Sequence, residues 1–203
     1  MPNSKICAAI LAGGKSSRFL SGDKALAKWG NKTIIETEIE ILKEVFEYVF
    51  IISNYSDTYK ELGVEIFKDI YPFKGPLAGV HSALVNTKFD RVFIVGCDMP
   101  LLNKNLISWM KNINTWAPIV IPSLKKGLEP LHAIYHRSLA PIIENLLIKP
   151  QKTMGLQAFI NLLPYMQIKE EKIKSFCPKL LCLKGINTKE EFEILKKSMI
   201  LEN

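Results

Sequence analysis

One stretch near the N-terminus, residues 6–24, constrains the fold more than any other part of the chain. Residues 6–11, ICAAIL, are apolar at every position, so they lack the alternation of a half-exposed strand. Such a run is typical of a strand buried on both faces in a parallel sheet. It leads into Gly13 and Gly14, and the next residues carry hydroxyl groups and positive charge: Lys15, Ser16, Ser17, Arg18 and Lys24. The stretch predicts a core strand followed by a polar loop.

This loop has the composition of a phosphate-binding site. Gly13 and Gly14 permit positive φ and close approach of the backbone to a ligand, because no Cβ is in the way. The cations and hydroxyl groups beyond them offer charge and hydrogen bonds to phosphate oxygens. A nucleoside triphosphate would suit the loop. A glycine turn followed by solvated cations is the structural alternative.

Two other phosphate-binding motifs compete for this stretch. Residues 9–16 match a permissive Walker A motif with alanine in its first position, and residues 91–98 could form a Walker B strand. A P-loop needs a strand that ends before the first glycine and a helix after the lysine. Here Ala9 lies within the apolar run, and residues 21–23, Ser-Gly-Asp, interrupt a helix. The G-x-G-x-x-G motif of dinucleotide-binding folds is absent.

The stretch closely resembles the signature L-A-G-G-x-S-x-R-x-G-x-D-K of the molybdenum cofactor guanylyltransferase (MobA) family. This sequence matches it from Leu11 to Arg18 and again from Gly22 to Lys24. Later matching segments extend the resemblance over nearly the whole chain: Asn54, Asp69, 75–79, 97–100, 130–135 and 186–188. Members usually carry Met-Gly after the arginine. This chain has Phe19-Leu20, so the turn there must form without that glycine.

The resemblance implies both a fold and a reaction. The expected fold is a single α/β domain over residues 1–203, with a mostly parallel Rossmann-like sheet and helices on both faces, as in nucleotide-diphospho-sugar transferases. The implied reaction transfers GMP from GTP to the terminal phosphate of molybdenum-carrying molybdopterin and releases pyrophosphate. A related nucleotidyltransferase that uses CTP or a sugar-phosphate acceptor is the main alternative, although such relatives commonly show L-A-A-G. A P-loop NTPase and a non-enzymatic nucleotide-binding module also stay open.

The resemblance also implies roles for individual residues. Arg18, Lys24 and Asp98 are the expected catalytic residues. The loop amides, with Arg18 and Lys15, would neutralise the β- and γ-phosphates, while Lys24 would contact the α-phosphate. Asp98 follows an apolar strand, where a carboxylate can hold the expected cofactor, Mg²⁺. The expected nucleotide-binding residues are Leu11, Ala12, Gly13, Gly14, Lys15, Lys24, Asn54, Asp69 and Asp98, of which Leu11, Ala12, Gly13, Asn54 and Asp69 would contact the guanine and ribose.

The rest of the chain alternates between strand and helix patterns, which indicates an α/β sheet. Strands are predicted at residues 48–53, 64–68, 91–97, 117–122 and 128–135, and helices at 55–62, 76–86, 138–148 and from 188 onward. Asn54, Asp69 and Asp98 therefore follow predicted strands. Ligands bind at the carboxyl ends of strands in open α/β sheets, although Asn and Asp at such positions are also common turn formers. Residues 150–185 give no clear pattern.

Two capping boxes mark helix starts. The first, Thr33–Glu36, opens a helix with one apolar face and one predicted outward face: Ile35, Ile39, Leu42 and Phe46 against Glu38, Glu40 and Lys43. The second, Thr188–Glu191, opens a helix whose apolar residues are Phe192, Leu195 and Met199. His132 and His136 have the spacing of a zinc pair only in a helix, and their surroundings favour a strand.

Charge and cysteine usage limit the partners and the compartment. The net charge of +7 and the pI near 9.1 suit anionic small substrates, since the lysines are scattered and no aromatic-basic platform for nucleic acid is present. Cys7, Cys97, Cys177 and Cys182 lack C-x-x-C spacing, which favours a reduced cytoplasm. No apolar run has signal-peptide or membrane length. The expected partners are the two substrates, with transient contacts to cofactor-synthesis proteins or molybdoenzyme apo-proteins.

Overall fold

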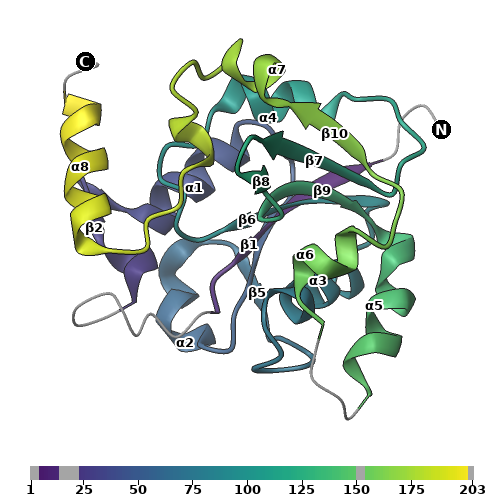
Figure 1. Ribbon diagram of the computed structural model, residues 1–203. Helices are drawn as coiled ribbons and strands as arrows, with labels where there is room; N and C mark the ends of the chain where they lie inside the picture. The colour runs from purple at the N-terminus through teal and green to yellow at the C-terminus, as the bar shows by residue number, and fades with distance from the viewer. Residues whose placement is uncertain (1–4, 14–22, 150–153, 201–203) are drawn as a thin grey trace.

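The structure, a computed structural model, describes residues 5–13, 23–149 and 154–200 and has one mixed sheet at its centre (Figure 1). The strand order is β10-β7-β9-β6-β1-β4-β5, and β8 pairs with β7. The strands are β1 (Ile6–Leu11), β2 (Lys28–Trp29), β3 (Lys32–Thr33), β4 (Val49–Ile52), β5 (Glu65–Phe67), β6 (Arg91–Gly96), β7 (Ile119–Leu124), β8 (Gly127–Leu128), β9 (His132–His136) and β10 (Met166–Lys169).

Helices connect most of these strands. The α-helices are α1 (Ile34–Lys43), α2 (Ser56–Tyr59), α3 (Pro76–Val85), α4 (Lys104–Lys111), α5 (Ala140–Leu147), α6 (Leu156–Ile160), α7 (Glu170–Lys174) and α8 (Lys189–Ile200). Short 3₁₀ helices are η1 (Lys24–Leu26), η2 (Lys60–Leu62), η3 (Arg137–Leu139) and η4 (Leu181–Leu183). None of the helices in the described part of the chain is long and apolar enough to cross a membrane.

The sheet divides into a parallel half and a mixed half. β1 pairs in parallel with both β4 and β6, and β5 extends this half beyond β4. In the mixed half, β9 runs antiparallel to β6 and to β7, and β10 is parallel to β7. The expected α/β architecture with a mostly parallel sheet is confirmed.

β1 is buried on both faces, as the apolar run predicts. Its side chains alternate between two core clusters, with Cys7 and Ala9 in one and Ala8 and Ile10 in the other. Helices α3, α5 and α6 cover the first face, below the sheet in Figure 1, and α1, α4 and α7 cover the second. Two layers of helices therefore enclose the sheet.

The capping box that starts α1 is present, but the prediction for Glu38 is wrong. Thr33 and Glu36 exchange the expected side-chain and backbone hydrogen bonds, and Glu40 and Lys43 are exposed. Glu38 was expected to face outward, yet its side chain is fully buried. The segment after β6 passes over this position, and the Met99 N–H donates to the Glu38 Oε1 at 2.8 Å. A backbone donor in the core needs an acceptor, which Glu38 supplies.

The mixed half departs in detail from the predicted strands. The segment predicted as one strand at 128–135 is divided between β8 and β9, which both pair with β7. The predicted helix at 138–148 begins as η3 and continues as α5. Residues 154–185, which had no clear pattern, form α6, β10, α7 and η4.

The C-terminal helix α8 packs against β2 and the start of α1. Its capping box is present, since Glu191 N–H donates to Thr188 Oγ1 at 3.2 Å and the Glu191 carboxylate accepts from the Asn187 N–H at 2.8 Å. Phe192 meets Trp29 edge to face, with ring centroids 5.6 Å apart. The cluster comprises Trp29, Ile34, Ile186, Phe192 and Leu195. The side chain of Met199 lies outside the described part of the structure.

Candidate functional site

The carboxyl ends of four parallel strands open into one pocket of about 230 Å³. Each strand contributes residues at or just after its end: Leu11 and Gly13 from β1, Ser53 and Asn54 from β4, Asp69 from β5, and Gly96, Cys97 and Asp98 from β6. Lys24 lines the pocket from η1. Parallel strands end at the same edge of a sheet, so residues distant in sequence converge there.

Six of the predicted site residues lie together in this pocket: Leu11, Gly13, Lys24, Asn54, Asp69 and Asp98. The predicted site wall at 75–79 is also represented, by Gly75, Pro76 and Gly79 at the start of α3. Ala12 is buried outside the pocket lining, and its N–H donates to the Ile52 carbonyl at 2.9 Å. Gly14, Lys15, Arg18 and the Phe19-Leu20 departure lie outside the described residues, so their predicted roles stay predictions.

An ion pair between Lys24 and Asp98 forms the charged centre of the pocket. The Lys24 Nζ lies 2.6 Å from the Asp98 Oδ2, and each side chain is less than one-fifth exposed, at 19% and 18%. The ammonium also lies 3.4 Å from the Ile186 carbonyl oxygen. Residues from the N-terminal region, the middle and the C-terminal region thus meet at one charged contact.

Asp23 holds Lys24 in place, a role that the sequence alone did not indicate. The Asp23 Oδ1 accepts a hydrogen bond from the Ala25 N–H at 3.0 Å and caps η1. Its other carboxylate oxygen accepts from the hydroxyl of Tyr59, the buried last residue of α2. These two hydrogen bonds fix the Asp23 side chain and, with it, the adjacent backbone at Lys24. The one sequence feature that could have pointed to Asp23 is its place next to Lys24 in the matched signature.

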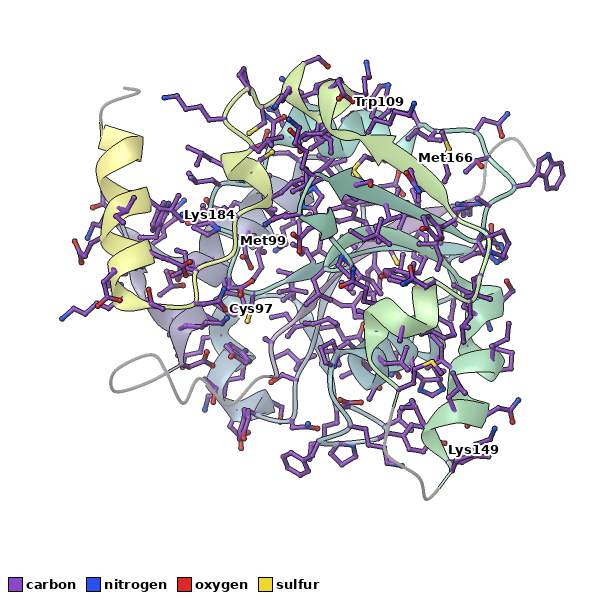
Figure 2. The ribbon with its side chains drawn as sticks, in the orientation of Figure 1. Cys97, Met99, Trp109, Lys149, Met166 and Lys184 are labelled. Carbon is purple, nitrogen blue, oxygen red and sulfur yellow. The ribbon has the colours of Figure 1, made fainter. Side chains whose placement is uncertain are left out.

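Two glycines leave room for the Asp98 carboxylate. A Cβ on Gly96 would lie 2.9 Å from the Asp98 Oδ1, and one on Gly185 would lie 3.2 Å from the Asp98 Cγ. The Ile186 N–H donates to the Asp98 backbone carbonyl at 2.8 Å, which holds the C-terminal segment against the end of β6. Figure 2 labels the chain neighbours of these residues: Cys97 and Met99 on either side of Asp98, and Lys184 before Gly185. The sequence analysis missed Gly185, because nothing local to residue 185 indicates a distant carboxylate.

Asp69 lines the pocket after β5, which is separated from β6 and Asp98 by β1 and β4 in the strand order. Its Oδ1 accepts hydrogen bonds from the Ser82 hydroxyl at 2.8 Å and the Tyr71 N–H at 3.3 Å. Burial raises the pKa of Asp69 above its usual value, and the bonds from Ser82 and Tyr71 oppose that rise. Ser82 also accepts from the Ile70 N–H at 2.9 Å. The carboxylate is thus anchored through one oxygen.

Behind Asp98, Glu38 forms a second, buried acidic position. Burial raises the pKa of Glu38 well above its usual range, while the hydrogen bond from Met99 lowers it and the charge of Asp98 raises it further. Its Oε2 has no hydrogen-bond partner within residues 5–13, 23–149 and 154–200. A neutral carboxyl group suits this position, because a buried unpaired charge is costly.

The donor set at Asp98 fits a cation that is completed by substrate oxygens. Within the residues that the structure covers, the Asp98 Oδ2 contacts Lys24 and its Oδ1 receives no hydrogen bond. The same residues contain no cluster of three or more His, Cys, Asp or Glu side chains that could enclose a metal. Mg²⁺ is commonly held by one or two carboxylates together with phosphate oxygens and water. Asp98 could supply such a carboxylate.

The two histidines considered as a zinc pair do not form one. His132 and His136 lie on β9, which confirms the strand prediction for this segment. His132 is fully buried against the Phe93 ring, with centroids 5.0 Å apart, and burial lowers the pKa of its imidazole to about 3. His136 instead caps η3 through Ser138.

Comparisons with known proteins agree with this geometry. A sequence model described as the MobA-like NTP transferase domain matches residues 8–167. A probable molybdenum cofactor guanylyltransferase from Clostridium perfringens is 40% identical, covering 97% of this chain and 99% of the relative. A molybdenum cofactor guanylyltransferase from Desulfosudis oleivorans is 34% identical, covering 91% of each.

A solved structure supports the fold independently. Molybdopterin-guanine dinucleotide biosynthesis protein A from Archaeoglobus fulgidus superposes with a TM-score of 0.81, covering 95% of this chain and 97% of that chain at 21% identity. The strand order, the pocket at the carboxyl ends of the strands and the full-length sequence relatives all support the same family assignment. The chain belongs to the MobA-like NTP transferase domain family.

Proposed function

We propose that this protein is a molybdenum cofactor guanylyltransferase. It transfers GMP from GTP to the terminal phosphate of molybdopterin that carries molybdenum, and pyrophosphate leaves. The observation that carries the proposal is the Lys24–Asp98 pair at the carboxyl end of β6, inside a chain that matches named guanylyltransferases over nearly its full length. A cation and a carboxylate 2.6 Å apart suit a reaction in which negative charge moves between phosphate groups.

The reaction needs alignment and charge neutralisation more than a general base. A terminal phosphate monoester has a second pKa near 6, so at neutral pH it is largely a dianion and can attack the α-phosphorus directly. Lys24 is assigned to the α-phosphate, and the hydrogen bonds of Asp23 to the Ala25 N–H and the Tyr59 hydroxyl support its backbone. The glycine-loop amides, with Arg18 and Lys15, are assigned to the β- and γ-phosphates. Such preorganised charge is the main catalytic device of phosphoryl-type transfers.

Asp98 is the residue assigned to hold Mg²⁺. The ion would neutralise charge on the phosphate oxygens. A turn of the Lys24 ammonium from Asp98 Oδ2 toward the α-phosphate would leave both Asp98 oxygens available to ligands. Gly96 and Gly185 keep the surrounding space open, since a side chain at either position would press on the carboxylate.

The nucleoside is assigned to the side of the pocket opposite Lys24. Leu11 and Gly13 offer an apolar side chain and open backbone, while Asn54 and Asp69 offer polar groups. Guanine differs from cytosine in size and from adenine in the hydrogen-bonding sense of its 6-position. A pocket whose buried polar groups pair with one base leaves them unpaired with another, at a cost of roughly 1 to 3 kcal/mol per group.

Competition among GTP, CTP, ATP and UTP in one assay, with molybdopterin as acceptor and Mg²⁺ present, tests the proposal. We expect kcat/KM for GTP to exceed that for CTP by at least about a hundredfold, with ATP also rejected. Pyrophosphate should appear only when the acceptor is present. Release of inorganic phosphate without acceptor would indicate a P-loop NTPase instead. Equal or better use of CTP would assign the protein to a cytidylyltransferase group.

A further inference from the structure

Cys177 and Cys182 form a thiol pair that the proposed reaction does not use. Cys177 follows α7, where its N–H donates to the Ile173 carbonyl at 2.9 Å, and Cys182 lies in η4. The chain turns back between them, since the Leu180 N–H donates to the Cys177 carbonyl at 2.9 Å and Leu180 has a left-handed φ of 57°. The Cys182 N–H then donates to the Cys177 Sγ at 3.2 Å. The turn places the backbone and the thiol of Cys182 beside the Cys177 sulfur.

The two cysteines differ in pKa and in exposure, as expected for an attacking thiol and the thiol that resolves its mixed disulfide. A hydrogen bond from the Cys182 thiol lowers the pKa of Cys177 to about 6 against the effect of burial, and the backbone N–H groups of Cys182, Leu181 and Leu180 act in the same direction. The same thiol contact and burial raise the pKa of Cys182. Cys177 is half-buried, whereas Cys182 is only 1% exposed. The half-buried Cys177, whose pKa is lowered, therefore lies beside the buried Cys182, whose pKa is raised.

The remaining cysteines lack this arrangement. Cys7 and Cys97 are buried in the core around β1 and β6, and burial raises the pKa of the Cys7 thiol to about 11. The Cys7 sulfur lies 3.2 Å from the Thr87 hydroxyl, a neutral contact of a core side chain. Burial also raises the pKa of Cys97. These two cysteines behave as small apolar residues, which makes them internal controls.

A short hydrogen-bonded path joins the thiol pair to the pocket. After Cys182, the Lys184 N–H donates to the Leu181 carbonyl at 3.0 Å. Next along the chain, Gly185 lies against the Asp98 carboxylate, and Ile186 bonds the Asp98 backbone through its N–H and contacts Lys24 through its carbonyl. Only two residues separate Cys182 from Gly185. A change of geometry in η4 would therefore reach the Lys24–Asp98 pair.

We propose that Cys177 and Cys182 are a redox-active thiol pair that closes into an intramolecular disulfide, and that closure alters the support given by Gly185 and Ile186 to the pocket. In exchange with a small disulfide such as oxidised glutathione, the Cys177 thiolate attacks one sulfur and releases one glutathione thiolate. Cys182 loses its proton to solvent, and its sulfur displaces the second glutathione from Cys177. Two protein thiols are oxidised while one glutathione disulfide is reduced to two thiols.

Analysis of tryptic peptides detects the disulfide directly. Trypsin cleaves after Lys174, Lys179 and Lys184, so the two cysteines fall on separate peptides, 175–179 and 180–184. The purified protein is treated with oxidised glutathione, and its remaining thiols are blocked with iodoacetamide in denaturant before digestion. We expect the two peptides to be joined until reduction, with Cys7 and Cys97 alkylated. Recovery of Cys177 and Cys182 as separate alkylated peptides would overturn the proposal.

Single variants test the order of attack. Without its resolving partner, Cys177 in the Cys182→Ser variant should accumulate as a mixed disulfide with glutathione. The matched variant Cys177→Ser should leave Cys182 reduced, because that sulfur is buried. The opposite labelling pattern would refute the assignment of Cys177 as the attacking thiolate.

The effect on the pocket is tested by hydrogen exchange and by turnover. In the oxidised protein we expect faster exchange of the Ile186 N–H and a kcat lower by about tenfold, because small displacements of positioned charges are costly. Both changes should be absent in a Cys177→Ser/Cys182→Ser variant. Unchanged exchange in a protein whose disulfide is established would overturn the coupling. The turnover measurement rests on the proposed function, whose own failure would appear differently, as no guanylyl transfer by the reduced protein.

Discussion

The two halves of the central sheet place their polar side chains in opposite ways. In the parallel half, the ends of β1, β4, β5 and β6 deliver polar or charged residues into one pocket. In the mixed half, polar groups are enclosed in the core: His132 is fully buried, and the buried Tyr135 donates its hydroxyl hydrogen to the Pro130 carbonyl at 2.8 Å. Of the described residues in the mixed half, only the apolar Leu131 lines the pocket.

Strand direction explains this difference for β9, the strand of the mixed half that pairs with β6. Neighbouring parallel strands end at the same edge, so the residues after them converge on one ligand. β9 runs antiparallel to both β6 and β7, so its carboxyl end lies at the opposite edge from theirs. Substitutions in the parallel half should therefore change turnover, and substitutions in the mixed half should change stability.

The largest effect is expected for Asp98→Asn. The variant should lose turnover to background, by about a thousandfold or more, because the carboxylate charge that would hold Mg²⁺ is removed. Folding should be affected less, since the amide has a similar shape and the Ile186 bond goes to the Asp98 backbone. Guanylyl transfer as a function of Mg²⁺ concentration, together with thermal unfolding, checks this. A destabilised variant with a normal Mg²⁺-dependent rate would show that Asp98 only supports the turn.

Lys24→Ala should have the next largest effect. Removal of a preorganised charge from the transition state is expected to lower kcat by about a hundredfold or more. Lys15→Ala is the matched comparison and should lower kcat less. Steady-state kinetics of both variants decide the ranking. If Lys15 proved the more important lysine, the loop would have Walker A geometry, and the assignment of Lys24 would be wrong.

Gly185→Ala tests the part of the pocket that comes from the C-terminal segment. The new Cβ would lie 3.2 Å from both the Asp98 Cγ and Oδ2, so either the carboxylate or the segment must shift. We expect kcat to fall by about tenfold, in keeping with the cost of misplacing a catalytic group. Gly155→Ala is a suitable control, because a Cβ there would have no atom within 4 Å. Equal kinetics in the two variants would show that the Gly185 contact has no effect on turnover.

His132→Phe should change stability in the mixed half with the smallest effect on turnover. Burial lowers the pKa of His132 to about 3 from 6.5, so below pH 6.5 the unfolded chain binds a proton that the folded chain excludes. The free energy of unfolding should therefore fall with decreasing pH, by up to about 1.4 kcal/mol per pH unit from this residue. Phenylalanine removes the proton site and keeps the ring against Phe93.

Urea unfolding between pH 7 and pH 4 measures this slope. The variant should lose less stability than the parent protein as the pH falls, while kcat at neutral pH stays unchanged. Identical pH slopes in the two proteins would mean that His132 is protonated in the folded state. A large loss of kcat would contradict the separation of roles between the two halves.

The sequence alone determined the features that depend on neighbouring residues. The unbroken apolar run at 6–11 predicted a strand buried on both faces, and β1 has that environment. Both capping boxes were readable because their partners lie three residues apart. Asn54, Asp69 and Asp98 could be placed at one edge of the sheet, since the alternation of strands and helices already implied parallel strands.

Only the tertiary structure decided which distant groups meet. Helical periodicity placed Glu38 outside, yet the segment after β6 covers it and provides the Met99 N–H as a partner. In the same way, Gly185 has no local signal, and its importance arises because Asp98 lies against it. The C-x₄-C spacing of Cys177 and Cys182 predicted no pairing until the turn at Leu180 brought their sulfurs together. A local sequence pattern indicates which secondary structure a segment prefers. A contact between two segments depends on how they pack together, which neither segment encodes by itself.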